Sequence, residues 1–353
     1  MFMALFSKAP DSLCILRLSA IGDVCNTIAV VQAIQRSWPK TKITWITGKL
    51  EASLISDLPG IEVIIFDKKQ GWKAYTSVWH KLKGRHFDAL LHMQYAIRAS
   101  ILTLGIKAHF KLGFDKKRSQ DFQQLFTNIK VPSPQSMHVL DGLMAFVEVL
   151  GIKDLERKWI LTYSDSDQAW ASSHLSIEKK TVVIVPAASK AYKNWMVDGY
   201  RHLIEHIHAK GWNCILAGSP APIELTLSQQ ITDKLSFPIL NLVGESSLKE
   251  MLALLDNADL VIAPDTGPAH MANAMSTPVI GLYAHHNPLR TGPYRYQQYV
   301  VSAYEEALFA ETQKSPSEVE WRTRVKDKDA MKRIKVEQVT AMFDQFNQQT
   351  SRN

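Results

Sequence analysis

The sequence predicts an α/β protein with two Rossmann-like domains that face each other across a cleft. Short apolar runs alternate with longer segments of helical apolar spacing in both halves, which indicates parallel sheets covered on both faces. The length of 353 residues suits two domains of ordinary size. A polar stretch at 155–180 has no strand-like run and divides the two halves.

Each half is expected to alternate strands and helices. In the first half we predict a helix at 26–38 and strands at 12–18, 42–47, 62–66 and 88–93. In the second half we predict helices at 197–210, 221–234 and 247–258, strands at 181–187, 213–218 and 239–244, and a stretch at 261–283 that begins and ends as a strand. The predicted domains are 1–160 and 178–330, followed by a helical segment at 331–353 for which packing against the N-terminal domain is one arrangement.

The composition is that of a globular protein, with 46% hydrophobic and 21% charged residues. No apolar run approaches the roughly 20 residues that span a bilayer, and the first ten residues are too short for a secretory signal. Cys14, Cys25 and Cys214 are far apart, which argues against a disulfide framework and against a zinc site. These features predict a cytoplasmic protein.

The positive charge lies in the first half of the chain. Residues 1–155 hold 20 Lys and Arg against 12 Asp and Glu, whereas the whole chain carries only +7. The excess is densest at 107–120. Such a run is either a solvated face or a surface for an acidic partner such as a phosphorylated lipid. Aromatic residues are not interleaved with these lysines, so we predict no nucleic-acid partner.

Polar residues gather where two predicted strands end. Gly22 and Asp23 follow the first strand, and "PDTGPAH" (264–270) follows the strand that begins at 261. Ligands of open parallel sheets bind at the carboxyl ends of the strands, so both loops are candidate ligand sites. Helix capping is the alternative for either aspartate. Neither loop contains the glycine pattern of dinucleotide binders, which argues against a dehydrogenase.

Two groups of residues invite a metal interpretation. Asp165 and Asp167 form a D-x-D pair of the kind that binds metal ions in some enzymes, but they precede a predicted helix, where capping explains them. His285 and His286 are adjacent and have no third partner in the sequence, which is typical of a loop. We therefore predict no metal site.

Three segments carry a family resemblance: "SAIGDVCNTIAVVQAI" near the start, "KNWMVDGYRHLI" in the middle and "PDTGPAHMANAMSTPVIGLY" later. Together they resemble glycosyltransferase family 9, the ADP-heptose:lipopolysaccharide heptosyltransferases, in order over about residues 12 to 300. The resemblance implies the two-domain GT-B fold, with an N-terminal acceptor domain and a C-terminal donor domain. The version "GLYAHHNPLRTGPY" is most similar to the branch that adds the first heptose to phosphorylated Kdo.

The resemblance implies a role for each matching residue. Asp23 would be the general base for the acceptor hydroxyl, and Ser19 and Gly22 would shape its loop. Lys193 would neutralise the donor diphosphate, and Glu224 would accept from the ribose hydroxyls. The full set of implied donor-binding residues is Ser189, Lys193, Glu224, Asp265, Thr266, Gly267 and His270.

The implied acceptor site is basic. Lys111, Lys116, Lys117 and Arg118 would meet the acidic acceptor as one cluster. Arg98 would also reach that acceptor, with a surface salt bridge as the alternative. Two positions depart from the family: His92 stands where relatives often have Asp, and His285–His286 where many have Gly-Pro-Thr/Ser.

The prediction is an inverting, metal-independent enzyme without a cofactor, whose donor substrate is ADP-heptose. Its acceptor would be Kdo–lipid A or inner-core lipopolysaccharide, reached by peripheral contact with the inner face of the inner membrane. The alternatives are transfer of the second or third heptose or of another sugar, and a non-catalytic nucleotide-sugar-binding protein.

Overall fold

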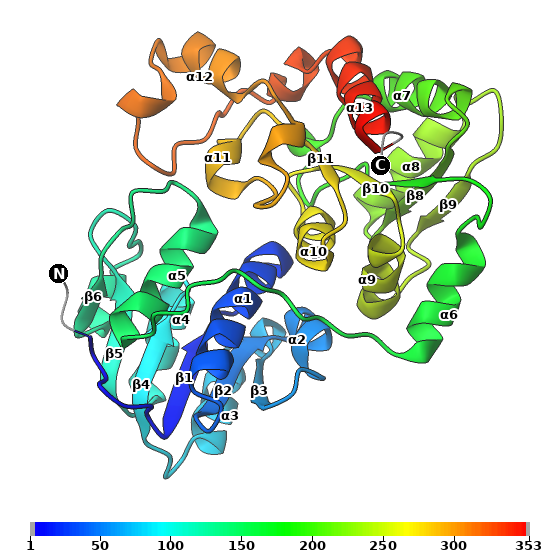
Figure 1. Cartoon of the computed structure of the whole chain (residues 1–353). Helices are drawn as coiled ribbons and strands as arrows, with labels where there is room; N and C mark the ends of the chain where they lie inside the picture. The colour runs from blue at the N-terminus through cyan, green and yellow to red at the C-terminus, as the bar shows by residue number, and fades with distance from the viewer. Residues whose placement is uncertain (1–3, 351–353) are drawn as a thin grey trace. The chain divides into compact units, whose positions relative to one another are not determined.

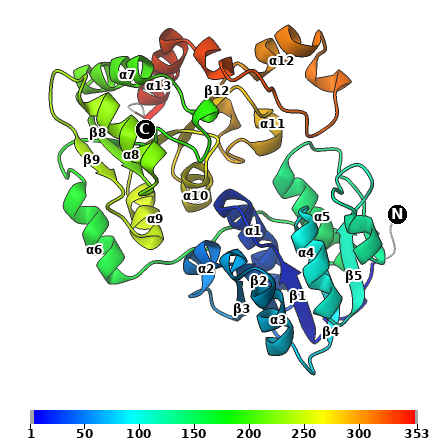
Figure 2. The same cartoon turned by 180° about the vertical axis from the view of Figure 1, so that it is seen from behind.

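All strands belong to two six-stranded parallel sheets, one in each of two units, within residues 4–350 that the computed structural model describes (Figures 1 and 2). The first unit ends at Thr162 and the second begins at Tyr163. The α/β prediction with parallel sheets is therefore confirmed.

The first sheet has the order β3-β2-β1-β4-β5-β6. Its strands are β1 (Ser12–Leu16), β2 (Lys42–Gly48), β3 (Ile61–Phe66), β4 (Phe87–His92), β5 (Ala108–Phe114) and β6 (Ile129–Val131). The helices of this unit are α1 (Ile21–Ser37), α2 (Lys49–Ile55), α3 (Trp72–Lys81), α4 (Ile97–Leu102) and α5 (Val139–Leu150).

The second sheet has the equivalent order β12-β11-β10-β7-β8-β9. Its strands are β7 (Thr181–Ile184), β8 (Asn213–Gly218), β9 (Leu240–Val243), β10 (Leu260–Pro264), β11 (Val279–Tyr283) and β12 (Val300–Ser302). The helices of this unit are α6 (Asp165–His174), α7 (Val197–Ala209), α8 (Pro222–Thr232), α9 (Leu248–Asp256), α10 (Gly267–Met275), α11 (Pro288–Thr291), α12 (Tyr304–Thr312) and α13 (Val336–Thr350).

Each strand order has one switch point. In the first sheet the chain runs outward from β1 to β3 and then returns to the other side of β1 as β4. In the second sheet β7 and β10 are the corresponding neighbours. Crevices form at the carboxyl ends of such strand pairs, because the connections leave in opposite directions there. The loops after β1, β4, β7 and β10 are therefore the places to look for a site.

Apolar residues account for the central strands. All four residues of β7 and all five of β10 are buried, as expected of parallel strands covered by helices on both faces. Helix α1 buries 12 residues, including the run Val24–Ile34. None of the helices within residues 4–350 is both long and apolar enough to cross a bilayer.

The structure also shows what the apolar pattern missed. Strands β5, β6 and β12 were not predicted: β5 contains polar residues of the basic segment 107–120, and β6 and β12 are three residues long. Helix α6 lies in the second unit, ahead of the predicted start of that domain at 178. The apolar face of α13 (Val339, Phe343, Phe346) joins the core of the second unit beside α7, so packing on the N-terminal domain is not needed to bury it.

Candidate functional site

Asp23 is held by a buried arginine at the first switch point. It lies in the first turn of α1, and its Oδ2 forms an ion pair with the Arg17 guanidinium and accepts from the Ala20 amide at 3.3 Å. The Arg17 side chain is 1% exposed, whereas that of Asp23 is 35% exposed. Both contacts fall on Oδ2, and Oδ1 makes no hydrogen bond within residues 4–350. The carboxylate thus has one oxygen fixed and one available.

Arg17 was not singled out from the sequence. It follows β1, its guanidinium donates to the Met93 carbonyl as well as to Asp23, and it lies 5.7 Å from the centre of the Tyr95 ring. The signal that could have found it is a lone charge in the apolar run "CILRL". A charge buried at the end of a central strand needs a counterion, and Asp23 is that counterion.

Two glutamines fix the loop between β1 and α1. Gln94 Oε1 accepts from the amides of Leu18 and Ser19 at 3.0 and 3.3 Å. Gln123 is fully buried, and its Nε2 donates to the carbonyls of His92 and Gln94 at 2.8 and 3.1 Å. The backbone of Ser19 is therefore part of the loop that shapes the Asp23 site, and its peptide bond to Ala20 is cis. Gly22 is buried in the first turn of α1.

His92 is a neutral, fully buried residue at the end of β4. Burial, reinforced by the charges of Arg17 and Lys111, lowers its pKa to about 3. Its Nε2 lies 3.0 Å from Ser100 Oγ in α4. At neutral pH this histidine is therefore an uncharged side chain of the interior, and packing there together with the contact to Ser100 explains its presence.

The predicted basic cluster does not form as one exposed surface. Lys116 and Lys117 are exposed after β5, but Lys111 is half-buried in the strand and donates to the Thr103 carbonyl at 2.9 Å. Arg118 is buried, and it donates to the carbonyls of Ser136 at 2.6 Å and His138 at 3.3 Å, beside the start of α5. Arg118 as a surface residue for the acceptor is therefore a wrong prediction; charge density along the chain does not show which side chains turn inward.

Arg98 is exposed at the start of α4. Burial of Glu51 in α2 raises the pKa of that carboxyl group, and the positive charge of Arg98 opposes this rise. No salt bridge of Arg98 occurs within residues 4–350, so the alternative of a surface ion pair is not observed. Arg98 thus remains available on the same edge of the sheet as Asp23.

Lys193, Asp265 and His286 meet at the second switch point. Asp265 Oδ2 accepts from Lys193 Nζ at 2.8 Å and lies 2.5 Å from His286 Nδ1. His270 Nε2 lies 4.0 Å from Oδ1. A cavity of about 10 Å³, roughly the size that holds one water, adjoins this group. The residues come from the loops after β7, β10 and β11, which the parallel sheet brings to one edge.

The carboxylate of Asp265 is ionised. Burial alone would raise its pKa, but the hydrogen bond with His286 and the charges of Lys193, His286 and His270 outweigh burial and hold the pKa well below its usual range. The side chain is only 16% exposed. Asp265 therefore holds cationic groups in place and is poorly suited to act as a base.

The residues around Lys193 explain its position. The lysine ends a short 3₁₀ turn at 191–193, which is followed by Asn194, whose Oδ1 accepts from the Ala188 amide at 2.8 Å. Trp195 is buried and donates to the Ile334 carbonyl at 2.9 Å. In the sequence "KNW", Lys193 is thus followed directly by two residues, Asn194 and Trp195, whose hydrogen bonds fix the backbone beside it.

His285 and His286 have roles that the sequence did not reveal. The two ring nitrogens of His285 lie 2.8 Å from the Tyr192 carbonyl and 3.0 Å from the Val325 carbonyl, so its ring fixes the turn that carries Lys193. His286 instead contacts Asp265 and lies 3.4 Å from Lys193 Nζ. Two adjacent histidines are typical of an ordinary loop. Their roles could not be predicted from the sequence, because the contacts are made to residues on strands and loops that are distant in sequence.

Helix α10 begins directly beside Asp265. Thr266 is its N-cap residue and makes no capping hydrogen bond with its side chain, so its hydroxyl is not used by the helix. Gly267 opens the helix, and His270 is buried in the first turn. Pro268 has no N–H, so the first turn of α10 offers one backbone amide fewer than its number of residues. A helix start with an uncommitted hydroxyl suits an anion.

Glu224 and Ser189 occupy the same edge of the second sheet. Glu224, in the first turn of α8, accepts from the backbone amide of Ser219 at 2.7 Å and from its hydroxyl at 2.6 Å. Ser189 is exposed in the loop after β7. A ribose bound by Glu224 would compete with Ser219 for the same two oxygens.

Neither candidate metal group is arranged as a metal site. Ser164 caps α6 with Asp167, whose Oδ2 accepts from the Ser164 amide at 2.8 Å, so capping is confirmed there. Within residues 4–350 no three His, Cys, Asp or Glu side chains are placed to share a metal ion. The absence of a metal requirement stays a prediction.

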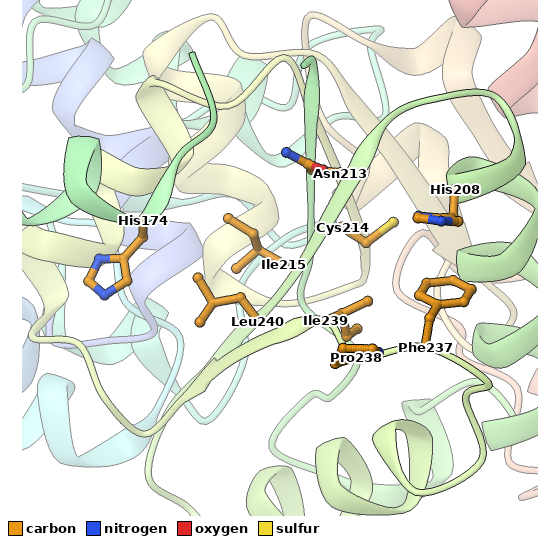
Figure 3. Close-up of a pocket in the computed structure, with 9 residues that line it drawn as sticks. All are labelled: His174, His208, Asn213, Cys214, Ile215, Phe237, Pro238, Ile239 and Leu240. Carbon is orange, nitrogen blue, oxygen red and sulfur yellow. The ribbon is translucent and has the colours of Figure 1, made fainter. Parts of the chain in front are cut away.

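A separate cavity lies at the opposite edge of the second sheet. Its volume is about 210 Å³, and Figure 3 shows the stacked rings of His208 and Phe237 on one side and His174 on the other. The cavity is lined by the first residues of β8 and by Leu240 of β9, which mark the amino ends of these strands. It is therefore distinct from the Lys193 group.

Comparison with known proteins identifies relatives of the whole chain. The model of the family "Glycosyltransferase family 9 (heptosyltransferase)" matches residues 75–321. The chain is 50% identical to the lipopolysaccharide core heptosyltransferase OpsX of Haemophilus influenzae, over 96% of this chain and 97% of that protein. It is 24% identical to lipopolysaccharide heptosyltransferases 1 and 3 of Escherichia coli K12, over 83% and 74% of this chain and 94% and 79% of theirs.

Solved structures share the fold. A family 9 glycosyl transferase from Veillonella parvula superposes with a TM-score of 0.77 at 19% identity, covering 98% of both chains. The E. coli heptosyltransferase WaaC with ADP superposes with a TM-score of 0.65 at 21% identity, covering 82% of this chain and 92% of that one. These likenesses support the GT-B fold class that the sequence predicted.

Proposed function

Because the chain belongs to glycosyltransferase family 9, the heptosyltransferases, we propose that it transfers L-glycero-D-manno-heptose from ADP-heptose to the Kdo or inner-core region of lipopolysaccharide. The 50% identity to a lipopolysaccharide core heptosyltransferase supports the acceptor class. A related structure that contains ADP supports the nucleotide. The reaction inverts the configuration at the anomeric carbon of the transferred heptose.

The observation that carries the proposal is the state of Asp23. Its Oδ2 is fixed by Arg17 and the Ala20 amide, while the 35% exposed side chain leaves Oδ1 to accept a proton. In the proposed reaction the acceptor hydroxyl attacks the anomeric carbon as its proton passes to Oδ1, and the bond from that carbon to the diphosphate breaks. A positioned base of this kind contributes about 10²–10⁴-fold in rate.

The Lys193 group would bind the leaving ADP. The Lys193 ammonium lies 2.8 Å from Asp265 Oδ2. Donor phosphates placed at the start of α10 would meet Lys193, the Thr266 hydroxyl and the amide of Gly267. As negative charge grows on the diphosphate, these groups stabilise it. Ser189, Glu224 and His270 complete the proposed donor contacts.

The acceptor contacts fall on the first unit. Arg98, at the start of α4, and Lys116 and Lys117, after β5, are exposed cations. An acceptor with carboxylate and phosphate groups gives these charges a partner. We place the enzyme in the cytoplasm, peripheral on the inner face of the inner membrane, where it would act on Kdo–lipid A or inner-core lipopolysaccharide without nucleic acid and without a resident cofactor or metal.

The test is a turnover assay of the purified chain with ADP-heptose and Kdo–lipid A, with release of ADP and mass of the product as readouts. We expect one heptose added and no dependence on divalent cations after treatment with EDTA. A strict Mg²⁺ or Mn²⁺ requirement would overturn the metal-free mechanism. Acceptors that already carry one or two heptoses separate the first transfer from the second and third.

A non-catalytic nucleotide-sugar-binding protein is the remaining alternative. Such a protein would bind ADP-heptose in calorimetry but release no ADP with any acceptor. The arrangement around Asp23 argues against it, because binding a nucleotide in the second unit needs no partly exposed carboxylate in the first. Another nucleotide sugar that replaced ADP-heptose as the better donor would overturn the sugar assignment.

A further inference from the structure

A hydrophobic turn on the first unit has no part in the proposed chemistry. Residues 121–126 follow β5, and here Phe122 and Leu125 are 75% and 79% exposed. Ile97, at the start of α4, is a third exposed apolar side chain, and its amide donates to Asp121 Oδ2 at 3.3 Å. Large apolar side chains that gather at a surface mark an interaction site more often than scattered ones do.

The turn is fixed from behind by Gln123. This buried side chain donates to the carbonyls of His92 and Gln94, and its Oε1 accepts from the Phe114 amide at 3.1 Å. Because Gln123 points inward, Phe122 and Leu125 are held outward on a rigid support. Gln94 also binds the amide of Ser19, so the turn is linked by hydrogen bonds to the loop that carries Asp23.

The backbone of the turn is strained where the phenyl ring is displayed. Asp121 and Phe122 have φ of 48° and 58°, in the left-handed region that favours glycine and that asparagine and aspartate tolerate, so the strain falls on Phe122. A bulky aromatic residue in this region costs free energy. The fold does not use the ring for packing, since it is mostly exposed. The strain therefore points to a use of the ring outside the fold.

The charges around the turn are those that bind an anionic surface. Lys116 and Lys117, in the loop after β5, and Arg98, at the start of α4, are exposed beside it. The carboxylates of the same loops are turned to the backbone: Asp115 accepts from the amides of Lys117 and Ser133, at 3.1 and 2.7 Å, and Asp121 accepts from Ile97. Asp121 is exposed and Asp115 half-buried, so the three exposed cations outnumber these two carboxylates and the net charge around the turn is positive.

We propose that residues 121–126, with Ile97, Arg98, Lys116 and Lys117, dock the chain on the surface of an anionic lipid bilayer. Phe122, Leu125 and Ile97 enter the interface between headgroups and acyl chains, and the cations bind the headgroups. This inference deepens the proposed function, since a lipid-linked acceptor lies in such a surface. The hydrogen-bonded link through Gln123 and Gln94 would hold the Asp23 loop near the docked turn.

The test uses the full chain and vesicles. Sedimentation with phosphatidylcholine vesicles that contain phosphatidylglycerol should show binding that weakens with salt, because salt screens the cations. The variant Phe122→Asn, Leu125→Gln should lower the partition coefficient by about ten-fold or more. Asparagine tolerates the left-handed conformation, so the melting temperature should not fall. Ile160→Gln, Ile177→Gln is the matched control, because it removes two exposed apolar side chains elsewhere.

Each outcome decides the proposal. Docking is refuted if the turn variant binds vesicles as well as the wild type does. It is also refuted if the wild type does not bind anionic vesicles at low salt. Heptose transfer to a deacylated, water-soluble acceptor separates this result from the proposed function: the turn variant should keep wild-type turnover there. Vesicle binding without any heptose transfer by the wild type would refute the proposed function and leave the docking surface standing.

Discussion

The two switch points each bring together a carboxylate, a cation and a histidine, and they use them differently. In the first unit Asp23 is paired with the buried Arg17, and His92 is neutral behind them. In the second unit Asp265 binds Lys193 and His286 through the same oxygen. Asp23 is 35% exposed and Asp265 is 16% exposed.

The difference separates two uses of one residue type. A buried guanidinium on one side of Asp23 fixes the carboxylate and leaves its other oxygen open to a substrate. Two donors on Asp265 turn the carboxylate into a support for the groups that, in the proposed function, would meet the diphosphate. Position at a strand end makes both residues candidates for a site, and the partners decide which of them can move a proton.

The largest expected effect is at Asp23. Asp23→Asn should lower the turnover number by about 10²–10⁴-fold while ADP-heptose binding, measured by calorimetry, stays close to wild type. The variant also leaves Arg17 without its counterion, which should cost about 1–3 kcal/mol of folding free energy, between exposed and fully buried pairs. Thermal melting therefore accompanies the assay, with Asp11→Asn as the matched control. Near-normal turnover would reduce Asp23 to a residue that stabilises the start of α1.

The next effect is at Lys193. Lys193→Ala should lower the turnover number and weaken ADP-heptose binding together, because the ammonium would act on a diphosphate that gains charge in the transition state. The barrier should rise by about 2.7–4 kcal/mol, as for the loss of one oxyanion contact. Lys190→Ala, an exposed lysine in the same loop, is the control and should stay near wild type. If Lys193→Ala left donor binding and turnover unchanged, the lysine would serve only to neutralise Asp265.

A smaller effect is expected at His286. His286→Leu removes the second donor on Asp265 Oδ2, so Lys193 should be held more tightly by the aspartate and be less available to the donor. ADP-heptose binding should weaken about ten-fold, the worth of one hydrogen bond to a charged group. The structural contacts of His285 are untouched, so the melting temperature is the control for folding. Tighter donor binding in this variant would contradict the supporting role of the histidine.

The smallest effect concerns the pH dependence of stability at His92. Burial lowers its pKa in the folded chain to about 3, from the ordinary histidine value of 6.5. Between these values only the unfolded chain binds the proton, so the free energy of unfolding falls as the pH drops through this window. Urea unfolding at pH 7.5 and pH 5 should show the wild type losing about 2 kcal/mol more than His92→Gln. Equal losses would mean that the ring is protonated in the folded chain.

The sequence alone determined the fold class and the location of the candidate site. Alternating apolar strands and helices allow few arrangements other than parallel sheets, and parallel strands end at one edge. The loops after β1 and β10 could therefore be recognised from the short motifs around Asp23 and Asp265. Strands β5, β6 and β12 were missed because their sequences are short or carry polar residues.

The tertiary structure decided the partners of each side chain. Arg17 meets Asp23 six positions away because the chain turns from the end of β1 into the first turn of α1, and His286 reaches Asp265 only because β11 lies beside β10. Local charge counting placed Arg118 in an acceptor cluster, whereas α5 buries it against two carbonyls. Burial and pairing depend on which elements become neighbours, and that is a property of the strand order, which connects residues far apart in the chain.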